Sequence, residues 1–324
     1  MLAACSSGSG AGSSSNAANQ STASGKKIVI DLIDLNNVSG DPFYGSLNCG
    51  ATQEASQLGV TLKVLAPAGA QASPQAQLPV LNAAIATKPD AIVMAASSST
   101  ALTPTIHQAM QQGIKFVMVD QPISDLTGVS SVVASDNDAV GEAAGQEMAK
   151  LLGDSGSAAV LSVQAGVPAG DERVSGFQAG LNGTGVNFAG ILRDPTVSTS
   201  TSAGLVTALL TKDSTVRGVY GVIDPLTAGI IAAAKQDNLT GKLDIIDTDA
   251  TPSEVALLKA GTVQALVAQR PTVIGSDGIQ QAYNAVTGKA VTAKITPSIL
   301  LVTKDNVDSS SVAPYLYSSS CSQS

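Results

Sequence analysis

The chain has 324 residues, of which 44% are hydrophobic and 13% are charged, so it can bury a core large enough for about two domains. Its 17 Lys and Arg residues against 25 Asp and Glu give a formal net charge of −8, which argues against a nucleic-acid partner because such binding relies on neutralising phosphates. No apolar run reaches the roughly 18 residues of a transmembrane helix, so no membrane span is expected.

The first 25 residues are predicted to be separate from the fold. Leu2–Cys5 reads LAAC and resembles the lipobox of bacterial lipoproteins, which implies lipid attachment at Cys5; a chance LAAC is the alternative. The basic and apolar parts of a signal peptide do not precede it, which fits a shortened start of the chain. Residues 6–25 are mainly Ser, Gly, Ala and Asn, the composition of a flexible tether.

From residue 26 the pattern alternates between strands and helices. Short β-branched runs predict strands, and the longer amphipathic stretches between them, such as residues 44–58 and 101–112, predict helices. The five strands of the first series are residues 26–35, 61–67, 91–97, 115–121 and 129–135.

A second series of five strands follows, and one further run is left over at residues 298–305. Continuous apolar strands separated by helices predict parallel sheets covered on both faces. We therefore predict an α/β protein with two doubly wound domains, in which ligands bind beyond the carboxyl ends of the strands. The strands of the second series are residues 158–165, 187–194, 217–224, 242–249 and 263–269.

Seven motifs in order resemble the periplasmic sugar-binding proteins of ribose-binding type, which serve ABC importers. The resemblance covers nearly the whole predicted fold and implies a type I periplasmic binding fold, with two lobes joined by a three-stranded hinge. The motifs are NNVSGDPFYGSL, PDAIVMAASSSTAL, GIKFVMVDQP, VVASDN, DERVSGFQAGL, IIDTDATPSEVALLKAGTVQALVAQRPTVIGSDGIQQA and LLVTKDNV.

The same resemblance implies three crossings between the lobes. The N-terminal lobe is expected to comprise residues 26–134 and 270–300, and the C-terminal lobe residues 135–269 and 301–317. Residues 1–25 are then the lipobox remnant and tether, and residues 318–324 a tail.

An aromatic pair follows the first strand. In the family, the loop at this place puts rings against the C–H faces of the sugar, which implies that role for Phe43 and Tyr44. Rings suit it because they offer a flat apolar surface at little rotamer cost. The alternative is that either ring, above all Tyr44, packs into the core.

Polar side chains at strand ends match the family's sugar-binding residues. The resemblance implies hydroxyl contacts from Asp120, Arg173, Asp249 and Gln269, and Asp41 stands where the family commonly has a polar side chain. Charged partners make the strongest hydrogen bonds to hydroxyls in a dry site. Ordinary ion pairs at strand ends are the alternative. The other candidate ligand-binding residues are Gln121, Asp171 and Asp224.

Two positions depart from the ribose-binding pattern. Gln121 stands where ribose binders have arginine, and Ile223-Asp224 stands where they have Asn-Asp. The ribose pattern of contacts is therefore not expected to transfer. A different pentose, a deoxy sugar or a small acyclic polyol fits at least as well.

With Cys5 lipidated, Cys49 and Cys321 remain. An even pair in an exported chain is read as a disulfide, and related exported binding proteins share a cysteine at both places. Two free thiols are the alternative.

No metal, cofactor or catalytic centre is expected. His107 is the only histidine, and it has no clustered cysteines to join it. Nucleophile-elbow, Walker and dinucleotide-binding motifs do not follow any predicted strand.

We expect a non-enzymatic solute-binding protein that captures a small sugar or polyol and delivers it to an ABC permease. It should act outside the cytoplasm as a monomer, held to the membrane only by its lipid. A sugar-responsive transcriptional regulator core is one alternative, but it needs a helix-turn-helix where the tether stands. A secreted glycoside hydrolase is the other.

Overall fold

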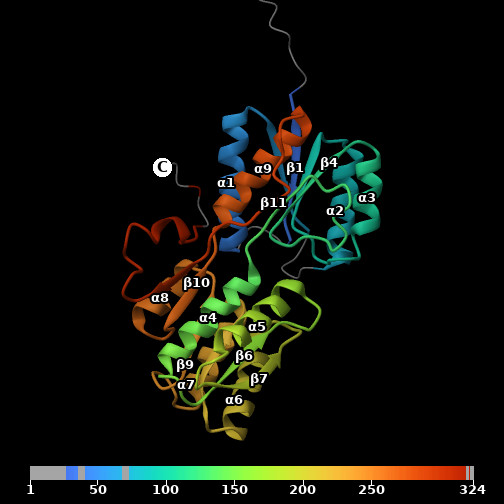
Figure 1. The fold of residues 1–324 in the computed structure, drawn as a ribbon. Coiled ribbons are helices and arrows are strands. Elements are labelled where there is room, and N and C mark those ends of the chain that lie inside the picture. Colours follow the sequence, from blue (N-terminus) through green and yellow to red (C-terminus); the bar gives the residue numbers. More distant parts are fainter. Residues whose placement is uncertain (1–26, 36–40, 68–72, 319–320, 322–324) are drawn as a thin grey trace, which may run out of the picture.

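The computed structural model describes residues 27–35, 41–67, 73–318 and 321, which form two α/β lobes (Figure 1). The first lobe contains a six-stranded sheet in the order β11-β5-β4-β3-β1-β2, in which every neighbouring pair is parallel. Parallel strands place their carboxyl ends at one edge of the sheet. The strands are β1 (Val29–Ile33), β2 (Thr61–Leu65), β3 (Ala91–Met94), β4 (Lys115–Val119), β5 (Ser131–Val133) and β11 (Lys294–Ile295).

Helices cover both faces of this sheet because successive strand residues point to opposite sides. Ile92 and Met94 face the core beneath α2 (Pro74–Ala86) and α3 (Thr103–Gln111). Val93 faces the core beneath α1 (Pro42–Leu58) and α9 (Pro271–Thr287), which lie on the other face (Figure 1).

Helices α1 and α9 approach each other through glycines. A Cβ added to Gly50 would lie 1.9 Å from the backbone oxygen of Thr272. We therefore expect Gly50→Ala to lower the free energy of unfolding by about 1–3 kcal/mol, the usual range for overpacking. Gly204 is the matched control, since it lies in helix α6 (Thr199–Lys212) with open space around its Cβ position.

Urea denaturation followed by circular dichroism measures both variants. Gly204→Ala should be neutral or stabilising by up to about 1 kcal/mol, because alanine favours the helix. Equal effects of the two substitutions would contradict the close approach of the helices.

The second lobe contains the sheet β12-β10-β9-β8-β6-β7, parallel except for the β10–β12 pair. Its strands are β6 (Ser157–Ser162), β7 (Asn187–Arg193), β8 (Val216–Gly221), β9 (Asp244–Thr248), β10 (Ala265–Ala268) and β12 (Leu300–Thr303). Its remaining helices are α4 (Asn137–Leu151), α5 (Pro168–Leu181), α7 (Asp224–Gln236), α8 (Pro252–Ala260) and the short 3₁₀ helix η1 (Ala313–Tyr315).

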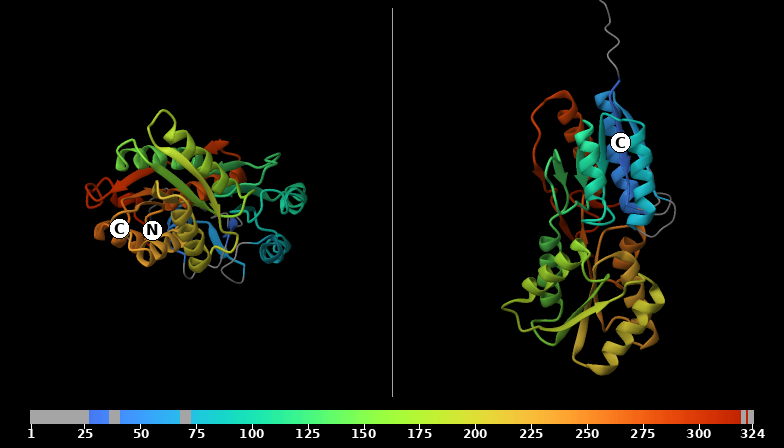
Figure 2. Two further views of the ribbon diagram at one scale, coloured as in Figure 1. Left: turned by 90° about the horizontal axis from the view of Figure 1, so that it is seen from below. Right: turned by 90° about the vertical axis from the view of Figure 1, so that its right-hand side faces the viewer.

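Three segments connect the lobes, which are stacked end to end (Figure 2). They follow β5, β10 and β11, at residues 134–136, 269–270 and 296–299. The predicted two-lobed α/β fold with a three-stranded hinge is therefore confirmed. No helix of the described residues is long and apolar enough to cross a membrane.

Candidate ligand-binding site

Asp120 directly follows strand β4 in the first lobe and has a positive φ of 57°, a conformation that non-glycine residues rarely adopt. Its Oδ2 accepts a hydrogen bond of 2.6 Å from the hydroxyl of Tyr44 on α1. Burial raises the pKa of Asp120 to about 6, although the Tyr44 hydrogen bond and the charge of Arg173 oppose the shift. A residue with a strained backbone, whose carboxylate is held by a buried tyrosine, is typical of a functional site.

The start of helix α1 fixes the aromatic pair. Asp41 is the N-cap, and its Oδ1 accepts from the backbone nitrogens of Phe43 (2.9 Å) and Tyr44 (3.4 Å). The two rings meet edge to face at 5.3 Å, and both are buried, with 8% and 3% exposed. Core packing therefore contributes to the role of both rings, and their contact with a sugar stays a prediction.

Asp249 is the counterpart of Asp120 in the second lobe. It follows strand β9 directly and has a φ of 88°. Its Oδ1 accepts hydrogen bonds from Gln269 Nε2 (2.7 Å) and from the hydroxyl of Tyr317 (2.8 Å). Burial raises the pKa of Asp249, while the charge of Arg173 and these two hydrogen bonds lower it. Each lobe thus presents an aspartate at the carboxyl end of a strand.

Arg173 interacts electrostatically with both aspartates. It projects from α5 with only 5% of its surface exposed, and its charge lowers the pKa of both Asp120 and Asp249. Its Nη1 donates to the backbone oxygen of Val222 (2.7 Å) and its Nε to Asn137 Oδ1 (3.0 Å). Within the described residues, Nη2 donates to no partner, so a charged donor remains for a ligand.

Tyr317 belongs to this group, although the sequence did not single it out. Its hydroxyl donates to Asp249 and accepts from the backbone nitrogen of Gln269 (3.2 Å), and its ring meets Phe43 edge to face at 5.9 Å. The next residue, Ser318, exchanges hydrogen bonds with Ser46 of α1. The C-terminal segment therefore contacts both lobes at the site.

Three predicted residues form no hydrogen bond with this group among the described residues. Asp171 forms an ion pair of 2.8 Å with Arg193 and accepts from the backbone of Gly166, all within the second lobe. Gln121 is half-buried, and its side chain makes no hydrogen bond among the described residues. Asp224 begins α7, where burial raises its pKa and the charges of Asp249 and Asp41 raise it further. Their contacts with a ligand stay predictions.

Asp34 is a second residue that sequence reasoning missed. It follows β1, is 1% exposed, and accepts a hydrogen bond of 2.7 Å from Asn48 Nδ2. Burial raises the pKa of Asp34 from 3.8 to about 7; the Asn48 hydrogen bond opposes the shift, and the charges of Asp41 and Asp120 add to it. The sequence signal was a polar residue at the end of an apolar strand.

The raised pKa of Asp34 predicts a pH dependence of stability. The folded carboxyl holds its proton more tightly than the unfolded one, so this contribution to stability is greatest below pH 3.8 and is lost as the pH rises through about 7. Asp34→Asn lacks this titration and can still accept from Asn48. The variant's stability relative to the parent should therefore increase with pH.

Urea denaturation at about pH 4.5 and about pH 8 tests this expectation. Asp213→Asn is the control, because hydrogen bonds from Thr215 lower the pKa of exposed Asp213 and keep it ionised at both values. If the free energies of unfolding of the Asp34 variant and the parent differed by the same amount at both pH values, the prediction would be contradicted.

The predicted disulfide is confirmed. Cys49 of α1 is bonded to Cys321 of the tail, with their Cα atoms 5.2 Å apart. Cys5, the predicted lipid attachment site, lies outside the described residues. His107 faces Asp125 at 3.8 Å near the surface of the first lobe, away from the site.

Two α/β lobes joined by three segments, with polar side chains from both lobes meeting at their junction, define the class of two-lobed ligand-binding proteins. A family model described as a periplasmic binding protein domain matches residues 35–290. The chain belongs to this family.

Its relatives include the ribose import binding protein RbsB of Salmonella typhimurium, 29% identical over 281 residues, which span 86% of this chain and 90% of RbsB. An Agrobacterium vitis ABC transporter solute-binding protein bound with α-D-tagatopyranose is 29% identical with a TM-score of 0.84, covering 90% of this chain and 100% of its own. A second A. vitis solute-binding protein, with bound D-fucose, is 26% identical and has a TM-score of 0.81. The match covers 89% of this chain and 100% of that protein's chain. The resemblance stated from the seven motifs is confirmed.

Proposed function

We propose that the protein captures a small sugar or polyol between its two lobes, outside the cytoplasm, and delivers it to an ABC importer. The observation that carries this proposal is the pair of strand-end aspartates, Asp120 and Asp249, with Arg173 acting on both. Carboxylates and a guanidinium can each hold two neighbouring hydroxyls, which is what a polyol offers. The relatives named above, which are transport binding proteins, support the same function.

The proposed mechanism is hinge closure. Asp120 and Tyr44 come from the first lobe, whereas Arg173, Asp249 and Gln269 come from the second lobe or its edge. A ligand can contact both sets only when the lobes are together, so binding shifts the population toward the closed form. The three connecting segments allow this motion, and the importer recognises the closed surface.

The ligand is proposed to be a pentose other than ribose, a deoxy sugar or an alditol. Gln121 offers an amide where ribose binders have an arginine fork, and Ile223 offers a hydrocarbon where they have an amide. Both changes reduce the number of hydroxyls that can be paired. The A. vitis relative with bound D-fucose, a deoxy sugar, supports including that class.

A thermal-shift screen tests the function. Pentoses, hexoses, deoxy sugars and alditols are compared with amino acids and nucleotides, because a ligand that binds only the native state raises the melting temperature. We expect at least one sugar or polyol to stabilise the protein and no nucleotide to do so. Stabilisation by amino acids or nucleotides alone would overturn the proposal.

The proposal extends to a lipid anchor at Cys5, a monomeric state and a permease partner. Mass spectrometry of protein from its native host, compared with a Cys5→Ser variant, tests the lipid. Light scattering tests the monomer. Binding without chemistry is tested by incubation with candidate glycosides, from which no free sugar should be released.

A further inference from the structure

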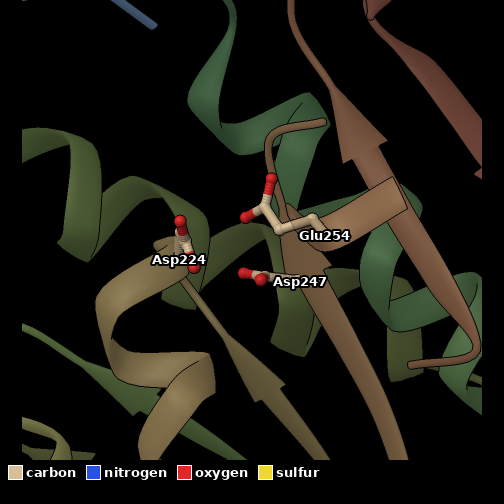
Figure 3. Close-up of side chains that lie close together, drawn as sticks. All are labelled: Asp224, Asp247 and Glu254. Carbon is tan, nitrogen blue, oxygen red and sulfur yellow. The ribbon is translucent and has the colours of Figure 1, made fainter. Parts of the chain in front are cut away.

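Three carboxylates converge in the second lobe, and one of them, Asp224, is also a candidate ligand-binding residue (Figure 3). Asp224 begins α7, Asp247 lies on β9 and Glu254 lies in α8. One oxygen of each lies within 4.8 Å of the others. Asp247 and Glu254 are fully buried, so water cannot separate their charges.

The protein leaves most of the oxygens in this cluster without hydrogen bonds. Glu254 Oε2 accepts from the backbone nitrogen of Thr251 (2.6 Å) as part of a capping box, but Oε1 has no hydrogen-bond partner in the described part of the chain. Neither carboxylate oxygen of Asp247 has a partner within the described residues. A buried polar atom without a hydrogen bond is costly unless something else binds it.

Thr227 of α7 provides an independent observation. Its side chain is 1% exposed and interacts with Asp247, but among the described residues its hydroxyl has no partner with the full geometry of a hydrogen bond. An unpartnered hydroxyl next to three carboxylates adds a neutral oxygen donor to the cluster. A neutral hydroxyl together with carboxylates forms a more suitable set of oxygen ligands for a cation than carboxylates alone.

Nothing in the described part of the chain neutralises the cluster. The ion pairs of that part involve other carboxylates, and Arg173 is linked electrostatically to Asp249. Three like charges in so small a buried volume require either protons or a cation. A cation can bind the Thr227 hydroxyl oxygen and oxygens of all three carboxylates at once, whereas a proton bridges only two oxygens, so the cluster favours the cation.

We propose that Asp224, Asp247, Glu254 and the hydroxyl of Thr227 form a calcium site. All the donors are oxygens, which hard cations prefer. Two ligands of one ion are separated by at most twice the metal–oxygen distance, about 4.6–5.2 Å for calcium and about 4.0–4.2 Å for magnesium. The carboxylate oxygens, which lie within 4.8 Å of one another, fall within the calcium range.

The site would join α7, β9 and α8. Asp247 is two residues before Asp249, so the metal site would lie next to the proposed sugar site in the sequence. In this proposal Asp224 is a ligand of the metal ion. The proposal goes beyond sugar capture and does not depend on it, since all the ligands come from the second lobe.

Isothermal titration of the chelator-treated full chain with calcium chloride, in buffer without sugar, tests the site. We expect one calcium ion per chain, with a dissociation constant of about 1 mM or tighter. Asp247→Asn and Glu254→Gln each remove one charge with little change of shape and should weaken binding at least about tenfold. Glu54→Gln removes the same charge from α1 in the other lobe and should bind calcium like the parent.

Absence of calcium binding up to about 10 mM would overturn the site. Retention of parental affinity in both cluster variants would overturn it as well. Tighter binding of magnesium or manganese would overturn the choice of calcium. Because no sugar is present, these results stand whether or not the proposed sugar function is correct.

Discussion

Arg173→Ala is expected to weaken sugar binding by roughly 2–5 kcal/mol, which corresponds to about 30-fold to about 4,000-fold. The side chain is buried, and its charge lowers the pKa of both Asp120 and Asp249. Removing the guanidinium would leave both carboxylates and the ligand's hydroxyls buried without their charged partner. That loss explains why the cost exceeds that of an ordinary hydrogen bond.

Calorimetry with the ligand found by the screen measures this effect. Arg217→Ala is the matched control, because Arg217 also donates to backbone oxygens of the second lobe, those of Leu152 and Ser155, but lies near the start of β8. The control should keep parental affinity even if its melting temperature falls. His107→Ala should also bind normally.

Phe43→Ala sets the scale for the aromatic contribution. Losing a stacked ring should cost about 1–3 kcal/mol of binding, chiefly through lost apolar area. The Arg173 variant should therefore bind more weakly than the Phe43 variant. Parental affinity in both, with ligand-free melting temperatures near the parent's, would show that the residue-by-residue transfer from the sugar-binding family is wrong.

The alternation of strands and helices was predictable because it depends on local pattern. Buried parallel strands such as β3 and β10 read as continuous apolar runs, and helix α1 has clear signals in its N-cap Asp41 and C-terminal Gly59. Strand β11 was not predicted. It has only two residues, too few to show any periodicity, and it forms because the chain pairs it with β5.

Part of the candidate site was predictable for the same reason. Asp120 and Asp249 end apolar strands, and the parallel sheet brings such ends to one edge. Tyr317 was not predictable, because its contact with Asp249 depends on the return of the tail over 68 residues. Nor could the pattern reveal that Asp224, Asp247 and Glu254 meet, since three separate elements carry them.

Replacing both disulfide cysteines by serine should lower the free energy of unfolding by roughly 2–5 kcal/mol. The bond joins residues 272 positions apart, so its loss frees nearly the whole chain in the unfolded state. Long closed loops restrict the unfolded ensemble most, which places the expected effect in the upper part of this range. The double variant Cys49→Ser, Cys321→Ser also removes the anchor of the segment that carries Tyr317.

This second consequence separates the disulfide's effect on the fold from its effect on the site. Without the bond to α1, the hydrogen bonds from Ser318 to Ser46 and from Tyr317 to Asp249 must hold the segment, which can then detach more easily. Urea denaturation followed by circular dichroism measures the stability, and calorimetry measures the sugar affinity. Cys5→Ser is the control, because it removes the remaining cysteine and leaves the bond intact. A double variant as stable as this control would show that the bond adds nothing to stability, whereas a loss of stability with unchanged affinity would show that Tyr317 stays at the site without its covalent anchor.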